Sequence, residues 1–232
     1  MKTKQLAFCA VMTALLIAVQ YALSFVSGVE LVTVFLLCFC YVFGIRCGMF
    51  TATAFSLLRC VLFGFVPNAV ILYLIYYNLF AVIFGAVGKH RPKAWISPLL
   101  LTLLCAASAY FAILGIPISA LYKKRVSVML WVLFGISAAL LVFCVMLLIS
   151  KNGEQISELA TVTAFAAIST VSFTLLDDII TPVFMGYSSE AAAAYFYTGF
   201  LAMLPQTICA AVSVFVLFLP LKRAFEAVGK KS

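Results

Sequence analysis

One stretch decides the fold class: VELVTVFLLCFCYVFGIRCGMFTATAFSLLRCVLFGF, residues 29–65. It consists of two apolar runs separated by a short turn at residues 44–46, and its only charged side chains are Glu30, Arg46 and Arg59. A helix needs about 20 predominantly apolar residues to cross the hydrocarbon core of a bilayer. Because each run approaches that length, the stretch is typical of two membrane-spanning helices joined by a tight turn.

The composition of the whole chain has the same character. Of its 232 residues, 66% are hydrophobic and 9% are charged, and the mean hydropathy is +1.23. A soluble domain carries about 45–50% apolar and about 25% charged residues. This difference excludes a soluble enzyme, a nucleic-acid-binding protein and a disordered chain. We therefore expect an all-α, polytopic bundle of membrane helices in direct contact with the lipid bilayer.

Further apolar runs flank the opening stretch on both sides. Together they predict about eight spanning helices, placed at residues 6–26, 29–44, 48–65, 69–88, 95–114, 126–150, 159–184 and 192–220. The first run is too long for the apolar core of a signal peptide, and no clean cleavage site follows it. The connections leave no room for a soluble domain, so we expect residues 1–232 to form a single transmembrane domain.

The basic residues predict an orientation. Lysine and arginine are retained on the cytoplasmic side of membrane proteins. Placing both termini in the cytoplasm puts every basic residue inside except Lys123, Lys124, Arg125 and the intrahelical Arg59. We therefore expect a multi-pass plasma-membrane protein with both termini cytoplasmic. The misplaced triplet leaves two alternatives open: the runs on either side of it form a peripheral hairpin, or one of them does not cross.

Polar side chains within the runs point to a binding site. Ionisable groups at membrane depth are costly, so they usually face a cavity or each other. Nearly all of those here fall in the outer half of the predicted bundle, and the inner halves are almost purely apolar. This predicts an outward-facing, aromatic-lined cup suited to a ring-containing ligand. The candidate substrate-binding residues are Glu30, Arg59, Tyr73, Tyr77, Asn78, Asp177, Asp178, Tyr195 and Gln206.

Several of these residues have a second interpretation. Arg59 contacts a ligand, or it pairs with an acidic residue to hold helices together. Asp177 and Asp178 diverge by about 100° on a helix, so only one can point squarely into a given cavity. Tyr195 is either a lining residue or an anchor in the interfacial aromatic belt. If the cup holds Glu30, Arg59 and both aspartates, three acids face one arginine, which favours a cationic or donor-rich ligand.

The first run carries small residues at helical spacing. Ala10, Ala14 and Ala18 recur every four residues, a pattern that lets another helix approach closely. This ridge either packs inside the chain's own bundle or forms a docking seam for another membrane subunit.

Catalysis and metal binding are not expected. None of the eight cysteines forms a CxxC pair, and His90 is the only histidine. Asp177 and Asp178 are adjacent, so they cannot face each other across two helices as intramembrane aspartyl chemistry requires. The chain has no Gly-x-x-x-x-Gly-Lys phosphate loop. We therefore predict no catalytic residues, no metal and no cofactor.

Three passages carry a family resemblance. The Ala10/Ala14/Ala18 ridge looks like an AxxxA coupling motif. Residues 29–48 with 57–65 are similar to a helix–turn–helix pattern, and residues 185–199 with 217–221 look like a last loop and last helix. In these passages the chain resembles the substrate-binding (S) component of energy-coupling factor (ECF-type) transporters, the vitamin uptake systems of prokaryotes. The resemblance covers residues 1–90 and 160–228.

The resemblance implies a six-helix core with residues 95–150 as an inserted two-helix hairpin. It also implies a mechanism: the protein binds a small water-soluble vitamin or precursor from outside. It then docks through the alanine ridge onto a membrane coupling subunit that two ATPase subunits drive. Where many members have Asp and His-Asn in the last helix, this chain has Met-Leu-Pro-Gln at 203–206 and Val-Ser at 212–213. No substrate is therefore carried over from the family.

The alternative is a self-sufficient secondary transporter. Such proteins often have internal repeats and broken helices at the middle of the membrane. No convincing repeat is present, and neither Pro182 nor Pro205 has a counterpart in the first half of the chain.

Overall fold

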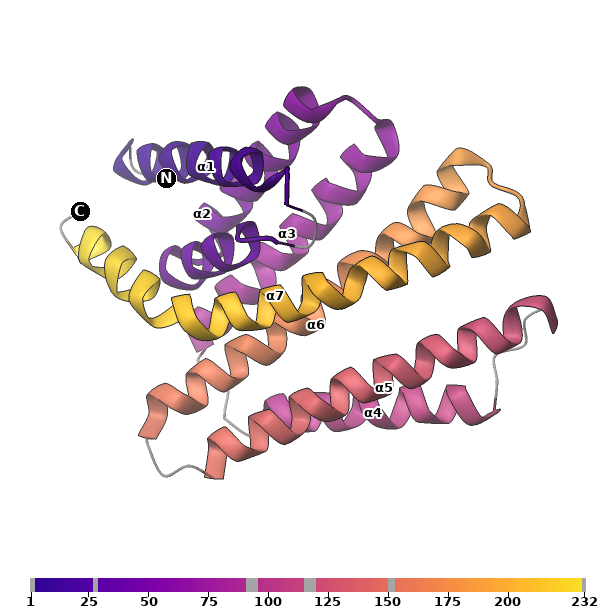
Figure 1. Cartoon of the computed structure of the whole chain (residues 1–232). Helices are drawn as coiled ribbons and strands as arrows, with labels where there is room; N and C mark the ends of the chain where they lie inside the picture. Colours follow the sequence, from indigo (N-terminus) through magenta and orange to yellow (C-terminus); the bar gives the residue numbers. More distant parts are fainter. Residues whose placement is uncertain (1–2, 27–28, 91–95, 115–119, 150–152, 231–232) are drawn as a thin grey trace.

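A computed structural model describes residues 3–26, 29–90, 96–114, 120–149 and 153–230. Within these ranges all regular secondary structure is helical (Figure 1). The seven elements are α1 (Thr3–Leu23), α2 (Val32–Phe63), α3 (Pro67–His90), α4 (Ile96–Leu114), α5 (Ala120–Ile149), α6 (Gly153–Met185) and α7 (Ser189–Lys230). Gly44 interrupts α2 with non-helical backbone angles, so the described chain contains eight helical segments. The predicted all-α fold of about eight helices is therefore confirmed.

The interruption at Gly44 folds α2 back on itself. Its backbone angles are φ 80° and ψ 178°, a conformation that glycine adopts with little cost. Across the turn, a Cβ added to Gly48 would lie only 2.7 Å from the Cys40 sulfur, so the two arms of α2 touch. The arms, residues 32–43 and 45–63, form the helix–turn–helix that the sequence predicts around residues 44–46.

Both arms of α2 pack closely against α3 along a line of glycines. A Cβ added to Gly85 would lie 2.7 Å from the backbone nitrogen of Ile45, and one added to Gly88 would lie 2.1 Å from the Tyr41 carbonyl oxygen. Small residues allow this approach of two backbones, which is common between membrane helices. The line of contact fixes the position of α3 relative to both arms of α2.

A substitution tests this contact. Because the atom facing Gly88 belongs to the backbone and cannot swing away, we expect Gly88→Ala to destabilise the protein by about 1–3 kcal/mol. The measurement is the apparent melting temperature of detergent-purified protein. Size-exclusion chromatography reports the fraction that stays folded after heating. Gly135→Ala in α5 is the matched control, because no described atom lies within 4 Å of a Cβ there. Equal melting temperatures for the two variants would contradict the proposed contact.

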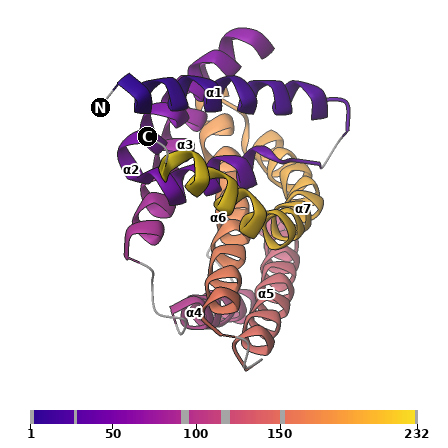
Figure 2. The same cartoon turned by 90° about the vertical axis from the view of Figure 1, so that its left-hand side faces the viewer.

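The main core is built around α2, and α4 and α5 lie apart from it. Large side chains buried at its centre include Phe39, Phe55, Phe84 and Phe218, from α2, α3 and α7. In the described part of the chain α4 and α5 pack on each other and on α6, with α5 also touching α7, and neither contacts α1, α2 or α3 (Figures 1 and 2).

Helices α4 and α5 run antiparallel. The Cys105 thiol lies 3.2 Å from the Ser137 hydroxyl, and the Ser127 hydroxyl donates to the Ala112 carbonyl oxygen at 3.4 Å. The predicted limits of the hairpin, residues 95 and 150, lie outside the described residues. That the hairpin is an insertion into a six-helix family core stays a prediction.

The helices have the length and surface of a membrane protein. Five of those in the described ranges are long and apolar enough to span a membrane: α1, α2, α3, Glu158–Met185 of α6 and Pro205–Gly229 of α7. The apolar stretches of α4 and α5 are shorter, Pro98–Leu114 and Leu130–Met146. Large apolar side chains face outward, such as Val61 at 72% and Val183 at 78% exposed. Such residues suit contact with lipid tails, and several helices of this kind suggest a multi-pass membrane protein.

The ends of two predicted helices are shifted. The helix α5 begins six residues before the predicted start and includes Lys123, Lys124 and Arg125. The helix α7 continues through Pro220 to Lys230 instead of ending at residue 220. It bends near its C-terminal end (Figure 1), as expected where a proline removes a backbone hydrogen bond. Both ends of the described chain lie close together (Figures 1 and 2).

Candidate ligand-binding site

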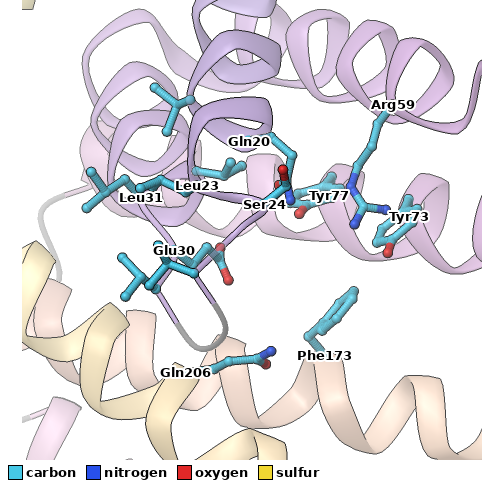
Figure 3. Close-up of a pocket in the computed structure, with 14 residues that line it drawn as sticks. Gln20, Leu23, Ser24, Glu30, Leu31, Arg59, Tyr73, Tyr77, Phe173 and Gln206 are labelled. Carbon is cyan, nitrogen blue, oxygen red and sulfur yellow. The ribbon is translucent and has the colours of Figure 1, made fainter. Parts of the chain in front are cut away.

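A cavity of about 310 Å³ lies where the end of α1, the α1–α2 connection, α2, α3, α6 and α7 meet (Figure 3). It brings together residues that are far apart in the sequence. Five predicted site residues line it: Glu30, Arg59, Tyr73, Tyr77 and Gln206. The sequence interpretation missed the other nine lining residues; three of them, Gln20, Ser24 and Phe173, are polar or aromatic. Phe173 carries no polar signal, and Gln20 and Ser24 are uncharged residues near a helix end, where polar side chains are ordinary.

Three aromatic rings form one wall of the cavity. Tyr73 and Tyr77 share a face of α3, as predicted, and their ring centroids are 5.9 Å apart with planes at 24°. The Phe173 ring of α6 lies nearly parallel to Tyr73, at 5.8 Å and 13°. Offset stacking of this kind is the favoured geometry of aromatic pairs. The wall is therefore held by contacts within the protein and presents flat apolar faces.

Arg59 stacks on this wall. Its guanidinium carbon lies 3.9 Å from the Tyr73 ring centroid, a cation–π contact worth about 0.5–2 kcal/mol. In the part of the chain that the structure describes, Arg59 forms no salt bridge, and its buried Nε atom has no hydrogen-bond partner. The interpretation that Arg59 holds helices together by pairing with an acid is therefore not supported.

Glu30 occupies the connection before α2. Its Oε1 atom accepts hydrogen bonds from the Thr33 backbone N–H, at 3.2 Å, and from the Thr33 hydroxyl. Its own N–H donates to the Cys209 sulfur at 3.3 Å, and the Cys209 thiol donates back to the Glu30 carbonyl at 3.5 Å. Burial raises the pKa of Glu30 above its ordinary value, although Thr33 and Arg59 act in the opposite direction. These contacts hold the connection against α7.

Asp177 and Tyr195 lie beside the cavity and do not line it. Asp177 is one turn beyond Phe173 on α6, and both of its carboxylate oxygens are occupied. The Thr181 hydroxyl donates to Oδ1 at 2.6 Å, and the Tyr195 hydroxyl donates to Oδ2 at 2.9 Å. The Asn68 amide donates in turn to Thr181 at 2.9 Å. This chain of hydrogen bonds joins α3, α6 and α7. Asp177 and Tyr195, predicted to line the cup, therefore connect helices beside the cavity instead.

Asp178 diverges from Asp177, as predicted, and faces α7. It is 7% exposed, and its Oδ1 atom has no hydrogen-bond partner within the described ranges. A Cβ added to Gly199 would lie 2.3 Å from that oxygen. Asp178 is therefore packed against the α7 backbone and is not among the residues that line the cavity.

Asn78 also has a different place. Its amide nitrogen donates to the Leu74 carbonyl at 2.8 Å, and its oxygen accepts from the Thr53 hydroxyl at 3.0 Å. One polar end of the side chain is used by its own helix α3 and the other joins α3 to α2, and Asn78 is not among the residues that line the cavity.

The opposite end of the molecule holds an ion pair that the sequence interpretation missed. Lys222 of α7 lies 2.5 Å from Glu158 of α6, and the Tyr41 hydroxyl of α2 donates to the same carboxylate. Arg46 and Lys89 line a cavity of about 880 Å³ at this end, together with Tyr41. All four charged residues lie just beyond the predicted apolar runs, so the expectation that the inner halves are almost purely apolar stays a prediction. Glu158 and Lys222 lie at the ends of apolar runs, where charges are usual.

The alanine ridge lies on the outside of the bundle. Ala10, Ala14 and Ala18 are exposed, whereas the opposite face of α1 buries Cys9, Met12 and Leu16. Packing of the ridge within this chain's own bundle is therefore not found for the described residues.

No protein-family model, curated protein or solved structure matches this chain.

A pair of variants tests the different positions of the two aspartates. Asp177→Asn replaces an acceptor by an amide NH₂ group against two hydroxyl donors, so we expect a loss of about 1–3 kcal/mol in stability. Asp178→Asn removes charge from a buried site without removing a hydrogen bond, so its melting temperature should equal or exceed that of the wild type. The measurement is the melting temperature of each variant, and we expect that of Asp177→Asn to be the lower one. The reverse order would show that the hydrogen-bond assignments are incorrect.

Proposed function

We propose that this chain is the membrane-embedded substrate-binding subunit of an ATP-driven, ECF-type importer. It captures a small water-soluble vitamin or precursor from outside the cell and performs no chemistry of its own. It then docks through the α1 ridge on a membrane coupling subunit, which two ATPase subunits drive.

The observation that carries the proposal is the cavity. Side chains from five helices and one connection converge on a volume of about 310 Å³, at the lower end of the range for small-molecule sites. Its lining combines aromatic faces with a few charged and amide groups, the composition expected of a site that orients a ligand.

The distribution of basic residues supports the proposed orientation. Arg46 and Lys89 share one cavity at the end far from Glu30, and Lys222 lies 5.3 Å from the Tyr41 ring that lines it. Lysine and arginine favour the cytoplasmic side. With that end inside and both termini beside it, the ligand cavity opens toward the exterior.

The alanine ridge supports the proposed docking. Three small residues, spaced one helical turn apart on an exposed face, allow close approach of a helix from another chain. We expect Ala14→Leu to leave ligand affinity unchanged and to abolish uptake in cells that supply the coupling and ATPase subunits. Ala106→Leu on α4 is the matched control, since Ala106 is also exposed and lies on the hairpin. Normal uptake by the Ala14 variant would assign the ridge to lipid contact only.

Ligand capture is tested directly with the purified chain. We expect at least one compound from a panel of B vitamins and their precursors to bind, and mass spectrometry to detect a small molecule that copurifies. No binding across the panel, with neither a copurifying molecule nor a copurifying coupling subunit, would count against the proposal.

A second candidate is a self-sufficient secondary transporter. Asp178 favours it, because an unpartnered acidic group inside a spanning helix is a common feature of proton pathways. Pro182 interrupts the backbone hydrogen bonding of the same helix one turn later. Uptake into liposomes that contain only this chain, driven by an ion gradient, would decide for this candidate.

A further inference from the structure

We propose that the cavity selects a small, flat-ring ligand that is dipolar: a cationic or hydrogen-bond-donating group faces Glu30, and a carboxylate or similar anionic acceptor faces Arg59. This inference rests on the proposed function, because it takes the cavity to be a ligand site.

The two charged side chains of the lining do not satisfy each other. Figure 3 shows the Glu30 carboxyl group and the Arg59 guanidinium group entering the cavity from opposite sides. They form no salt bridge, and they are the two charged residues of the described lining. A charge removed from water is costly unless it is paired. A ligand with one charge would leave the other side chain unmatched, whereas a dipolar ligand matches both.

Arg59 retains one buried donor, its Nε–H group, that nothing in the described chain uses. Its guanidinium carbon lies over the Tyr73 ring, and its side chain is also close enough to Tyr73 for a hydrogen bond. The buried Nε atom is without an acceptor. A carboxylate is the acceptor that matches the planar fork of an arginine, with two parallel hydrogen bonds.

Glu30 has a free side as well. The hydrogen bonds that it accepts from described residues both come from Thr33 and both end on Oε1. Its second carboxylate oxygen is therefore the one available to a ligand. An ammonium group or the N–H group of a ring would supply the donor that this oxygen lacks.

The aromatic wall sets the shape of the ligand. Tyr73, Phe173 and the largely buried Tyr77 all border the cavity, so the parts of their rings that reach it favour a flat, ring-containing ligand. Gln20 and Gln206 add amide groups that can hydrogen-bond heteroatoms at the ring edge. A volume of about 310 Å³ is enough for a small ring with two short substituents.

The structure also removes the argument for a purely cationic ligand. That expectation required Glu30, Asp177 and Asp178 to face Arg59 together. The two aspartates do not line the cavity, so the lining carries one acid against one base.

Four probes of one ring and one size test the inference by calorimetry on the purified full chain. They are 4-(aminomethyl)benzoate, which is dipolar, 4-methylbenzoate, which is an anion, 4-methylbenzylamine, which is a cation, and 4-(aminomethyl)benzamide, which lacks the carboxylate charge. We expect the dipolar probe to bind about tenfold tighter than each of the others, since each of the others lacks one of the two charged hydrogen-bonding groups. A singly charged probe that binds as tightly as the dipolar one would overturn the inference.

Two variants assign the ends of the ligand. Arg59→Gln should remove the preference for 4-(aminomethyl)benzoate over 4-(aminomethyl)benzamide and keep the preference over 4-methylbenzoate. Glu30→Gln should remove the preference for 4-(aminomethyl)benzoate over 4-methylbenzoate and keep the preference over 4-(aminomethyl)benzamide. Arg46→Gln, at the other end of the molecule, is the matched control and should change neither. Unchanged preferences in both cavity variants would overturn the inference. If a variant fails to fold, the ranking of the four probes on the wild-type protein still tests the inference.

The outcomes separate this inference from the proposed function. Binding of a neutral or singly charged vitamin, with no preference for the dipolar probe, would support ligand capture and overturn the dipolar class. Binding of no compound at all would overturn both.

Discussion

The close contact between α2 and α3 is the constraint on which the arrangement of the site depends. Gly44 turns the chain through a hairpin, and Gly85 and Gly88 let α3 lie directly against it. The second arm of α2 and α3 then run side by side, with the Ser56 hydroxyl donating to the Tyr73 carbonyl at 3.1 Å. Arg59 is one turn beyond Ser56, so the same contact places its guanidinium group over the Tyr73 ring. A wider spacing of the two helices would separate the charge from its aromatic support.

The few charged side chains of the bundle find their partners in different ways. The difference distinguishes charges that stabilise the fold from charges that are available to a ligand. Glu158 and Lys222 pair with each other, so they stabilise the junction of α6 and α7 and have little left for a ligand. Asp177 receives hydrogen bonds from two neighbouring helices. Glu30 and Arg59 are only partly matched by the protein and share one cavity. In an apolar bundle, an incompletely satisfied charge beside a cavity is the best sign of a ligand.

The sequence predicted the helices well, because apolar runs bounded by turn residues report directly on spanning segments. It also located the break at Gly44 and part of the site, since Arg59 is conspicuous in an apolar run. It misplaced Asp177, because polarity at membrane depth shows that a side chain needs a partner but not whether a helix or a ligand supplies it. It missed Phe173, which resembles any other core aromatic, and Glu158, whose partner is far away in the sequence. These assignments depend on which helices are neighbours, and a single sequence does not contain that information.

The hairpin of α4 and α5 widens the molecule on one side only. It rests on α6 and α7, and within the described residues it contacts neither α1, which carries the ridge, nor α2 and α3. In the plane of a bilayer the protein therefore has two independent flanks. The flank formed by α1 keeps the same outline whatever the length or composition of the hairpin. Loss or lengthening of α4 and α5 would change the lipid-facing perimeter of the protein and leave the opposite flank unaltered.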